Sequence, residues 1–189
     1  MIIASQNLTN FDISLPENTV YRVNLAWVDN LETLENILKK HNDREIFLDL
    51  PRNRTKPPNN KYTIDELEPI LANYENIKFL AISNVDSADD LTPFLKIIPD
   101  NCNLIPKIES PKGVYNIEKI TSLLGIKKII MLDHDDLYSS LLKSGEDTEK
   151  FQTYLKSLSE FCSANNVTLL RTIGVLFGDH EKRISEYIK

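Results

Sequence analysis

Short apolar runs alternate along the chain with segments in which apolar residues recur every three or four positions. The runs are rich in Ile, Leu, Val and Phe, a composition typical of strands that are covered on both faces. The three-to-four spacing between the runs is typical of amphipathic helices. We predict strands at residues 1–5, 21–28, 45–50, 77–85, 103–110, 126–134 and 167–177.

Helices are predicted between these strands and after the last one. The pattern Thr63-x-x-Glu66 is a capping box at the start of one helix, and Gly125 is placed to end another. The apolar stripes of the helices fall within residues 31–38, 67–71, 91–98, 117–124 and 151–161, and a short C-terminal helix is predicted at residues 179–189.

The order of these elements predicts an α/β fold. Strand and helix alternate at intervals of about 25–30 residues, which implies parallel βαβ units with right-handed crossovers. Both an open doubly wound sheet and a (β/α) barrel have this pattern. The dinucleotide-binding form of the open sheet carries G-x-G-x-x-G after its first strand, and this sequence has no such run. A barrel takes eight strands and about 250 residues, more than this chain offers, so the pattern alone leaves both architectures open.

Composition and charge narrow the function. The composition is that of one globular domain over residues 1–189. Lys and Arg number 22 against 28 Asp and Glu, a net charge of −6, which argues against binding to nucleic acid. No apolar stretch approaches the roughly 18 residues of a membrane span, and the N-terminus does not resemble a signal peptide. Cys102 and Cys162 lack metal-ligand spacing, so we expect reduced thiols in a cytoplasmic protein.

The candidate functional residues are polar residues inside the predicted strands or at their ends. Buried charges must meet a partner, a metal or water, because an unpaired buried charge costs several kcal/mol. The carboxyl ends of parallel strands are also where such folds place their active sites. An ion-pair network that only holds the interior together is the alternative. The residues concerned are Arg22, Asn24, Asp49, Lys107, Glu109, Asp135, Asp136 and Thr172.

One segment resembles a known family. Residues 105–120 are similar to the K-I-E-x-x-x-G-V-x-N-I-x-x-I segment of pyruvate kinase, a member of the phosphoenolpyruvate/pyruvate-binding superfamily. Weaker similarities in family order extend over residues 20–175. The resemblance implies a single, reduced TIM-type (β/α) barrel of about seven parallel strands. The lid and C-terminal domains of pyruvate kinase are missing, and residues 51–61 occupy the place of the lid.

The resemblance also implies roles for individual residues. Glu109 and Asp136 would hold Mg²⁺ or Mn²⁺. Lys107 and Thr172 would be catalytic together with Arg22, Lys107 beside the enolate and Thr172 near the substrate's methylene carbon. Substrate-binding roles fall to Arg22, Asn24, Arg54 and Asp135. Asn24 and Asp49 match a monovalent-cation site, but Ala26 and Leu50 stand where its hydroxyl ligands would be, so we expect that site to be lost.

The function expected from these residues is that of a metal-dependent enzyme acting through an enolate. Its substrate would be pyruvate, phosphoenolpyruvate or a related small 2-oxo or enol acid. Lyase or aldolase chemistry is favoured over kinase chemistry, because there is no lid to close over a nucleotide. The alternative is a non-catalytic barrel that binds a 2-oxo acid or a protein partner. A homodimer is a further expectation, since exposed sheet edges are normally paired or covered.

Overall fold

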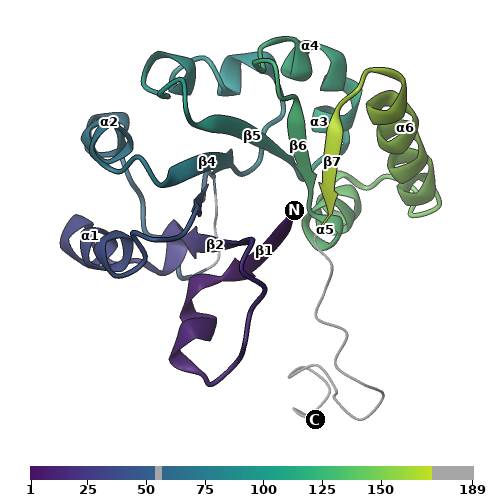
Figure 1. Ribbon diagram of the computed structural model, residues 1–189. Coiled ribbons are helices and arrows are strands. Elements are labelled where there is room, and N and C mark those ends of the chain that lie inside the picture. The colour runs from purple at the N-terminus through teal and green to yellow at the C-terminus, as the bar shows by residue number, and fades with distance from the viewer. Residues whose placement is uncertain (54–56, 172–189) are drawn as a thin grey trace.

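Seven parallel strands form one curled sheet in the computed structural model, which describes residues 1–53 and 57–171 (Figure 1). The strands pair in chain order, each with the next, so the sheet curls as a half-barrel. In the described part of the chain, β1 and β7 are the two edges. The strands are β1 (Ile2–Ser5), β2 (Thr19–Asn24), β3 (Ile46–Leu50), β4 (Ile77–Ile82), β5 (Asn103–Ile108), β6 (Ile129–Leu132) and β7 (Thr168–Arg171).

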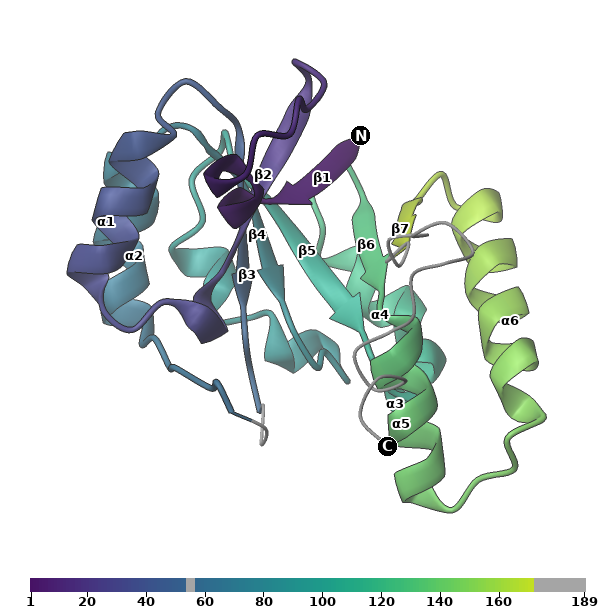
Figure 2. The same cartoon turned by 90° about the horizontal axis from the view of Figure 1, so that it is seen from below.

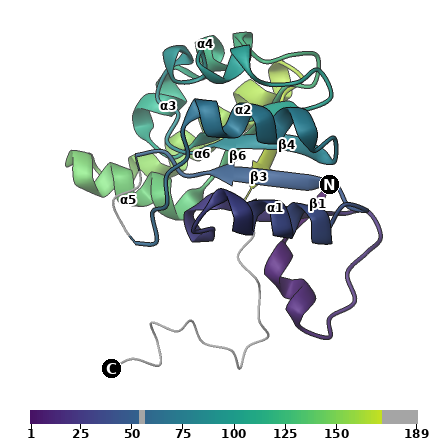
Figure 3. The same cartoon turned by 90° about the vertical axis from the view of Figure 1, so that its left-hand side faces the viewer.

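Helices cover the convex face of this sheet (Figure 2). Figure 3 shows α1 and α2 running along the outside of β3. Asn30 caps α1 by accepting a 2.9 Å hydrogen bond from the Thr33 N–H, and the predicted Thr63–Glu66 capping box starts α2. The helices are α1 (Leu31–Lys40), α2 (Ile64–Asn73), α3 (Pro111–Tyr115), α4 (Ile117–Ser122), α5 (His134–Ser144) and α6 (Lys150–Ala164).

Several segments differ from the predicted elements, among them α3, for which no helix is predicted, and η2 (Leu25–Trp27), which takes the end of a predicted strand. The predicted helix at residues 179–189 lies outside the described residues. Instead of one helix over residues 91–98, the chain forms two 3₁₀ turns, η3 (Ala88–Asp90) and η4 (Phe94–Lys96). Pro93 explains the break, because the residue before a proline is disfavoured in the helical region. Helix α5 is not predicted by the apolar pattern, because its first turn is polar and only Leu137 and Leu141 are buried.

The concave face of the sheet carries a small apolar layer of its own. It is distinct from the large core between the sheet and the helices. Because side chains alternate across a strand, residues two apart share this face. The buried members are Val20, Phe47, Ala81, Ile105, Ile129 and Met131, one or two from each of the strands β2 to β6. This layer supports the residues that follow it toward the carboxyl ends of the strands.

None of the helices in residues 1–53 and 57–171 combines the length and the apolar character needed to cross a bilayer.

Cys102 and Cys162 are both free and buried. Burial raises the pKa of the Cys102 thiol to about 12 and that of Cys162 to about 11. Since the thiolate is the reactive form, we expect both thiols to react with a disulfide reagent at pH 8 at least about tenfold more slowly than in unfolded protein. Absorbance stopped-flow with and without urea measures the two rates. Rapid labelling of either thiol in the folded protein would contradict this burial.

Candidate functional site

A polar layer lies directly above the concave apolar layer, at the carboxyl ends of the strands. The same alternation that places the apolar residues on this face continues into it. Arg22 follows Val20 by two positions, and Asp49, Ser83, Lys107 and Asp133 stand in the same relation to Phe47, Ala81, Ile105 and Met131. Five consecutive strands, β2 to β6, therefore each contribute a polar side chain to one site.

Lys107 lies at the centre of this layer and is only 5% exposed. Its Nζ is 2.8 Å from Oε1 of Glu109 and 3.5 Å from Oδ1 of Asp49. It also donates a 3.1 Å hydrogen bond to the Ser83 hydroxyl. The ammonium is thus held between two carboxylates from β3 and the end of β5, which fixes a positive charge on the floor of the site.

Arg22 pairs with the other oxygen of Asp49. Its Nε donates a 2.8 Å hydrogen bond to Oδ2, and Nη2 donates to the same oxygen. The Arg22 side chain is about one-third exposed, whereas that of Asp49 is buried. The guanidinium therefore reaches from a buried ion pair toward the open side of the site.

The Glu109 carboxylate is 2% exposed and its two oxygens differ in their contacts. Oε2 accepts a 2.7 Å hydrogen bond from the backbone N–H of Asn84. Oε1 is buried and, apart from its ion-pair contact with Lys107, accepts no hydrogen bond from the described part of the chain. A buried anionic oxygen with spare lone pairs is suited to bind a cation.

Two further carboxylates stand next to Glu109 at the start of α5. One oxygen each from Glu109, Asp133 and Asp136 lie within 4.8 Å of one another. Opposite oxygen ligands are about 4 Å apart around Mg²⁺ and about 5 Å apart around Ca²⁺. A cation the size of Ca²⁺ can therefore contact all three oxygens as they stand, whereas Mg²⁺ would draw them together by up to about 1 Å. Asp133 also caps α5, with Oδ1 accepting a 3.2 Å hydrogen bond from the Asp136 N–H, which fixes the two aspartates relative to each other.

The shifts in pKa follow from this arrangement. Burial favours the neutral form of all three central groups, but the opposite charges nearby outweigh it for two of them. For Asp49, the charges of Lys107 and Arg22 overcome burial and hold its pKa below the usual range. For Lys107, Asp49 and Glu109 overcome burial and raise its pKa. For Glu109, burial prevails over the attraction of Lys107, so its pKa is raised.

These side chains surround a cavity of about 90 Å³. This is enough for a few water molecules, or for a cation with part of a small ligand. Among the described residues that line it, the carboxylates of Asp49, Glu109, Asp133 and Asp136 face only two cations, Arg22 and Lys107. Two negative charges are therefore uncompensated within the lining, and a dication would balance them.

The structure brings most of the predicted site residues together. Arg22, Asn24, Lys107, Glu109 and Asp136 all line the cavity, as does Asp49. Asp135 does not line it and is exposed on the first turn of α5. Arg54 and Thr172 lie outside the described residues.

The structure also adds cavity residues that were not among the predicted site residues, namely Ser83, Asn84, Pro51 and Asp133. The two-residue spacing could have placed Ser83 and Asp133 on this face. The backbone conformation that brings in Asn84 has no comparable sequence signal.

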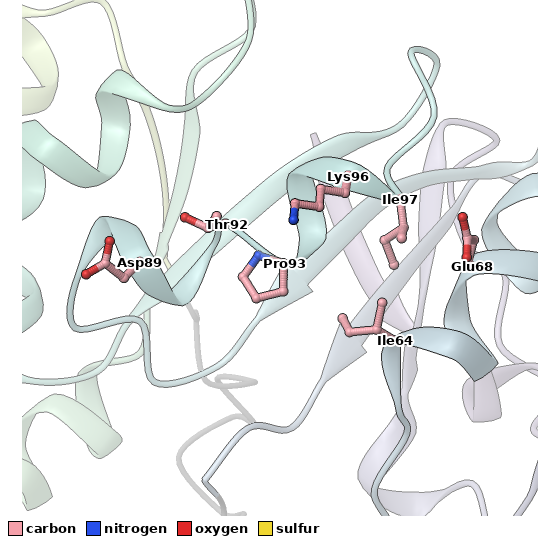
Figure 4. Close-up of a pocket in the computed structure, with 7 residues that line it drawn as sticks. All are labelled: Ile64, Glu68, Asp89, Thr92, Pro93, Lys96 and Ile97. Atoms are coloured by element: carbon pink, nitrogen blue, oxygen red, sulfur yellow. The ribbon is translucent and has the colours of Figure 1, made fainter.

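A larger groove lies elsewhere, on the helical side of the molecule between α2 and the turns η3 and η4 (Figure 4). Its volume is about 610 Å³, and it shares no lining residue with the polar cavity. Ile64, Pro93 and Ile97 supply apolar surface, whereas Glu68, Asp89 and Lys96 are scattered along the groove. Its charged groups do not converge, so the candidate site is the polar cavity.

Comparisons with known proteins show the fold. No protein-family model matches the chain, and no curated protein matches it. The chain is similar to the crystal structure of RipC from Yersinia pestis, with 16% sequence identity and a TM-score of 0.59. The similarity covers 86% of this chain and 72% of RipC. At this identity the likeness concerns the fold alone.

The identification of the chain as a pyruvate kinase-like barrel is therefore wrong. No family model supports it, the structure resembles that of RipC, and the seven strands of the described residues form a half-barrel. Within residues 105–120, local packing restricts the residue type at two of the similar positions, Gly113 and Asn116. A Cβ at Gly113 would come within 2.6 Å of the Val85 carbonyl oxygen, and the Asn116 side chain donates a 2.8 Å hydrogen bond to the Asp86 carbonyl. Such constraints can produce similar residues without common function.

Proposed function

We propose that the chain is a Mg²⁺- or Mn²⁺-dependent enzyme acting on a small 2-oxo acid through an enolate. The observation that carries the proposal is the buried Lys107 ammonium beside Glu109, whose carboxylate also belongs to the Glu109–Asp133–Asp136 triad. Glu109 and Asp136, with Asp133, would hold the cation. When bound, the cation supplies Lewis-acid polarisation of a carbonyl oxygen.

Lys107 supplies a fixed positive charge where negative charge develops. Transfer of a proton from the methyl carbon of a 2-oxo acid to a water molecule in the cavity moves the C–H electron pair into the new C=C bond and the carbonyl π pair onto oxygen, giving an enolate. A preorganised ammonium stabilises this oxygen without reorganising during the reaction. Because Asp49, Glu109 and Ser83 already hold Lys107 in place, its charge need not be repositioned.

The size and charge of the cavity support the substrate class. About 90 Å³ accommodates part of a small acid more readily than a nucleotide. Arg22 is partly exposed and can donate a hydrogen bond to a carboxylate while it remains paired with Asp49. Lyase or aldolase chemistry on the enolate is therefore favoured over phosphoryl transfer.

The proposed function also has consequences for the architecture, the oligomeric state and the cellular location of the protein. We propose that the sheet acts as a reduced TIM-type barrel, with the site at the carboxyl ends of its strands. The two free cysteines favour the reducing cytoplasm. Since β1 and β7 are edges of the described sheet, a homodimer that covers an edge is part of the proposal.

Deuterium exchange tests the proposed activity. With pyruvate in D₂O and Mn²⁺, we expect the protein to catalyse loss of the methyl-proton NMR signal. Glu109→Gln should slow the catalysed exchange by at least about 100-fold, because it removes a charge from the proposed cation site. Glu118→Gln, on the exposed side of α4, is the matched control and should exchange like the parent.

A second candidate function is that of a non-catalytic protein that binds a cation. The cavity lining carries more negative than positive charge, and this charge would oppose binding of an anionic substrate. Calorimetric titration with Mn²⁺ separates the two. Binding that is lost in Asp136→Asn, without exchange of pyruvate or other short 2-oxo acids, would support the non-catalytic candidate. If the protein neither binds Mn²⁺ nor catalyses exchange, both candidate functions are wrong.

A further inference from the structure

We infer that Asn84 is a positioning residue that orients the Glu109 carboxylate for cation binding. This inference rests on the proposed function. Asn84 follows β4 and has a backbone φ of +53°, in the left-handed region. Asparagine tolerates this region better than most residues, and β-branched residues disfavour it strongly.

The left-handed turn directs the Asn84 N–H at Glu109. The N–H donates a 2.7 Å hydrogen bond to Oε2, in the range of charge-assisted bonds. The turn is held on both sides, since the Ser83 N–H donates to the Leu50 carbonyl at 3.1 Å and the Val85 N–H donates to the Lys107 carbonyl at 3.2 Å. The direction of the Asn84 N–H is therefore set by β3 and β5 together.

The Asn84 side chain adds a second restraint. Its Nδ2 donates a 2.6 Å hydrogen bond to the Arg52 carbonyl, just after β3. The Arg52 guanidinium in turn lies 2.7 Å from the Asp90 carboxylate. These contacts tie the turn after β4 to the segments on either side of it.

The two Glu109 oxygens therefore have different roles. Oε2 is occupied by the Asn84 N–H, whereas Oε1 is buried and, apart from the Lys107 ammonium 2.8 Å away, has no polar partner among the described residues. With Oε2 held, the carboxylate cannot rotate freely, and the lone pair of Oε1 that the Lys107 ammonium leaves free stays available to a cation. Removing a hydrogen-bond partner of a metal ligand typically weakens metal binding by about 10- to 100-fold.

Asn166 provides a matched control. It has the same φ of +53°, but it lies between α6 and β7, before the amino end of a strand and so at the opposite edge of the sheet from the site. A valine at either position meets the same conformational penalty. Only the valine at position 84 should disturb Glu109.

The test is calorimetric titration with Mn²⁺ alone. Asn84→Val should raise the Kd by about 10-fold or more. Asn84→Gly keeps the N–H and permits the left-handed turn but loses the side-chain bond to Arg52, so it should weaken binding clearly less than Asn84→Val does. Asn166→Val should lower the melting temperature as Asn84→Val does, without changing the Kd. Parent-like binding by Asn84→Val, or equal weakening by the glycine variant, would overturn the inference.

An NMR measurement without metal separates this inference from the proposed function. The Asn84 amide proton should resonate downfield and move upfield in Glu109→Gln, because the charged acceptor is lost. If the parent protein fails to bind Mn²⁺, the proposed function fails. An amide signal that does not respond to Glu109→Gln would show independently that Asn84 does not hold this carboxylate.

Discussion

Replacing Lys107 by methionine is expected to lower the free energy of unfolding by about 3–5 kcal/mol, because it breaks a buried ion-pair network by removing its central cation. Asp49 and Glu109 would then face each other across the site without the ammonium that now lies 3.5 and 2.8 Å from them. Methionine preserves much of the side-chain volume, so the loss would report charge rather than packing. We also expect the catalysed proton exchange to disappear.

Urea unfolding measures this effect, and two further variants interpret it. Lys39→Met removes an ammonium that pairs with Glu35 at 3.0 Å on an exposed helix face, where solvent screens the charge, and should change stability little. Combining Lys107→Met with Glu109→Gln should recover part of the loss, since one unpaired buried charge is neutralised. If Lys107→Met unfolded at the parent's urea concentration, the site would be more hydrated than its burial indicates.

The fold was largely predictable because its dominant signals are local. Each of the seven predicted strands overlaps an observed strand, and Thr63 and Glu66 form the expected capping box. Where prediction failed, two signals competed. At Pro93 a backbone restriction overrode a helical apolar stripe. At His134 the polar first turn of α5 obscures a helix in which only Leu137 and Leu141 are buried.

The site was predictable where it depends on alternation and not where it depends on turns. Lys107 and Glu109 are two apart, and so were expected on one face, as observed. Asp135 and Asp136 were both assigned to the site, but in a helix successive residues point about 100° apart, and only Asp136 lines the cavity. Asn84 joins the site through its backbone N–H, a role for which residue type gives little indication.

Replacing Phe47 by alanine tests whether water is excluded from the concave layer of the half-barrel. Phe47 and Leu48 are neighbours on β3 and both are fully buried, but Phe47 lies in the concave layer and Leu48 in the core under the helices. The Phe47 ring packs against Phe79 with centroids 6.1 Å apart. If the concave layer is closed to water, Phe47→Ala should cost about 3–5 kcal/mol and Leu48→Ala a similar amount.

The two variants should differ in function although they agree in stability. Phe47 precedes Asp49 by two positions on the same face, so its removal takes away the support beneath the ion pairs that Asp49 makes with Arg22 and Lys107. We expect Phe47→Ala to slow proton exchange by about tenfold or more, as small displacements of catalytic groups do, and Leu48→Ala to leave it near the parent rate. Chemical unfolding and exchange measured on both proteins provide the comparison.

A cost below about 1 kcal/mol for Phe47→Ala would mean that water already reaches the concave layer. Lys107 would then act in a hydrated site, where its charge stabilises an enolate far less.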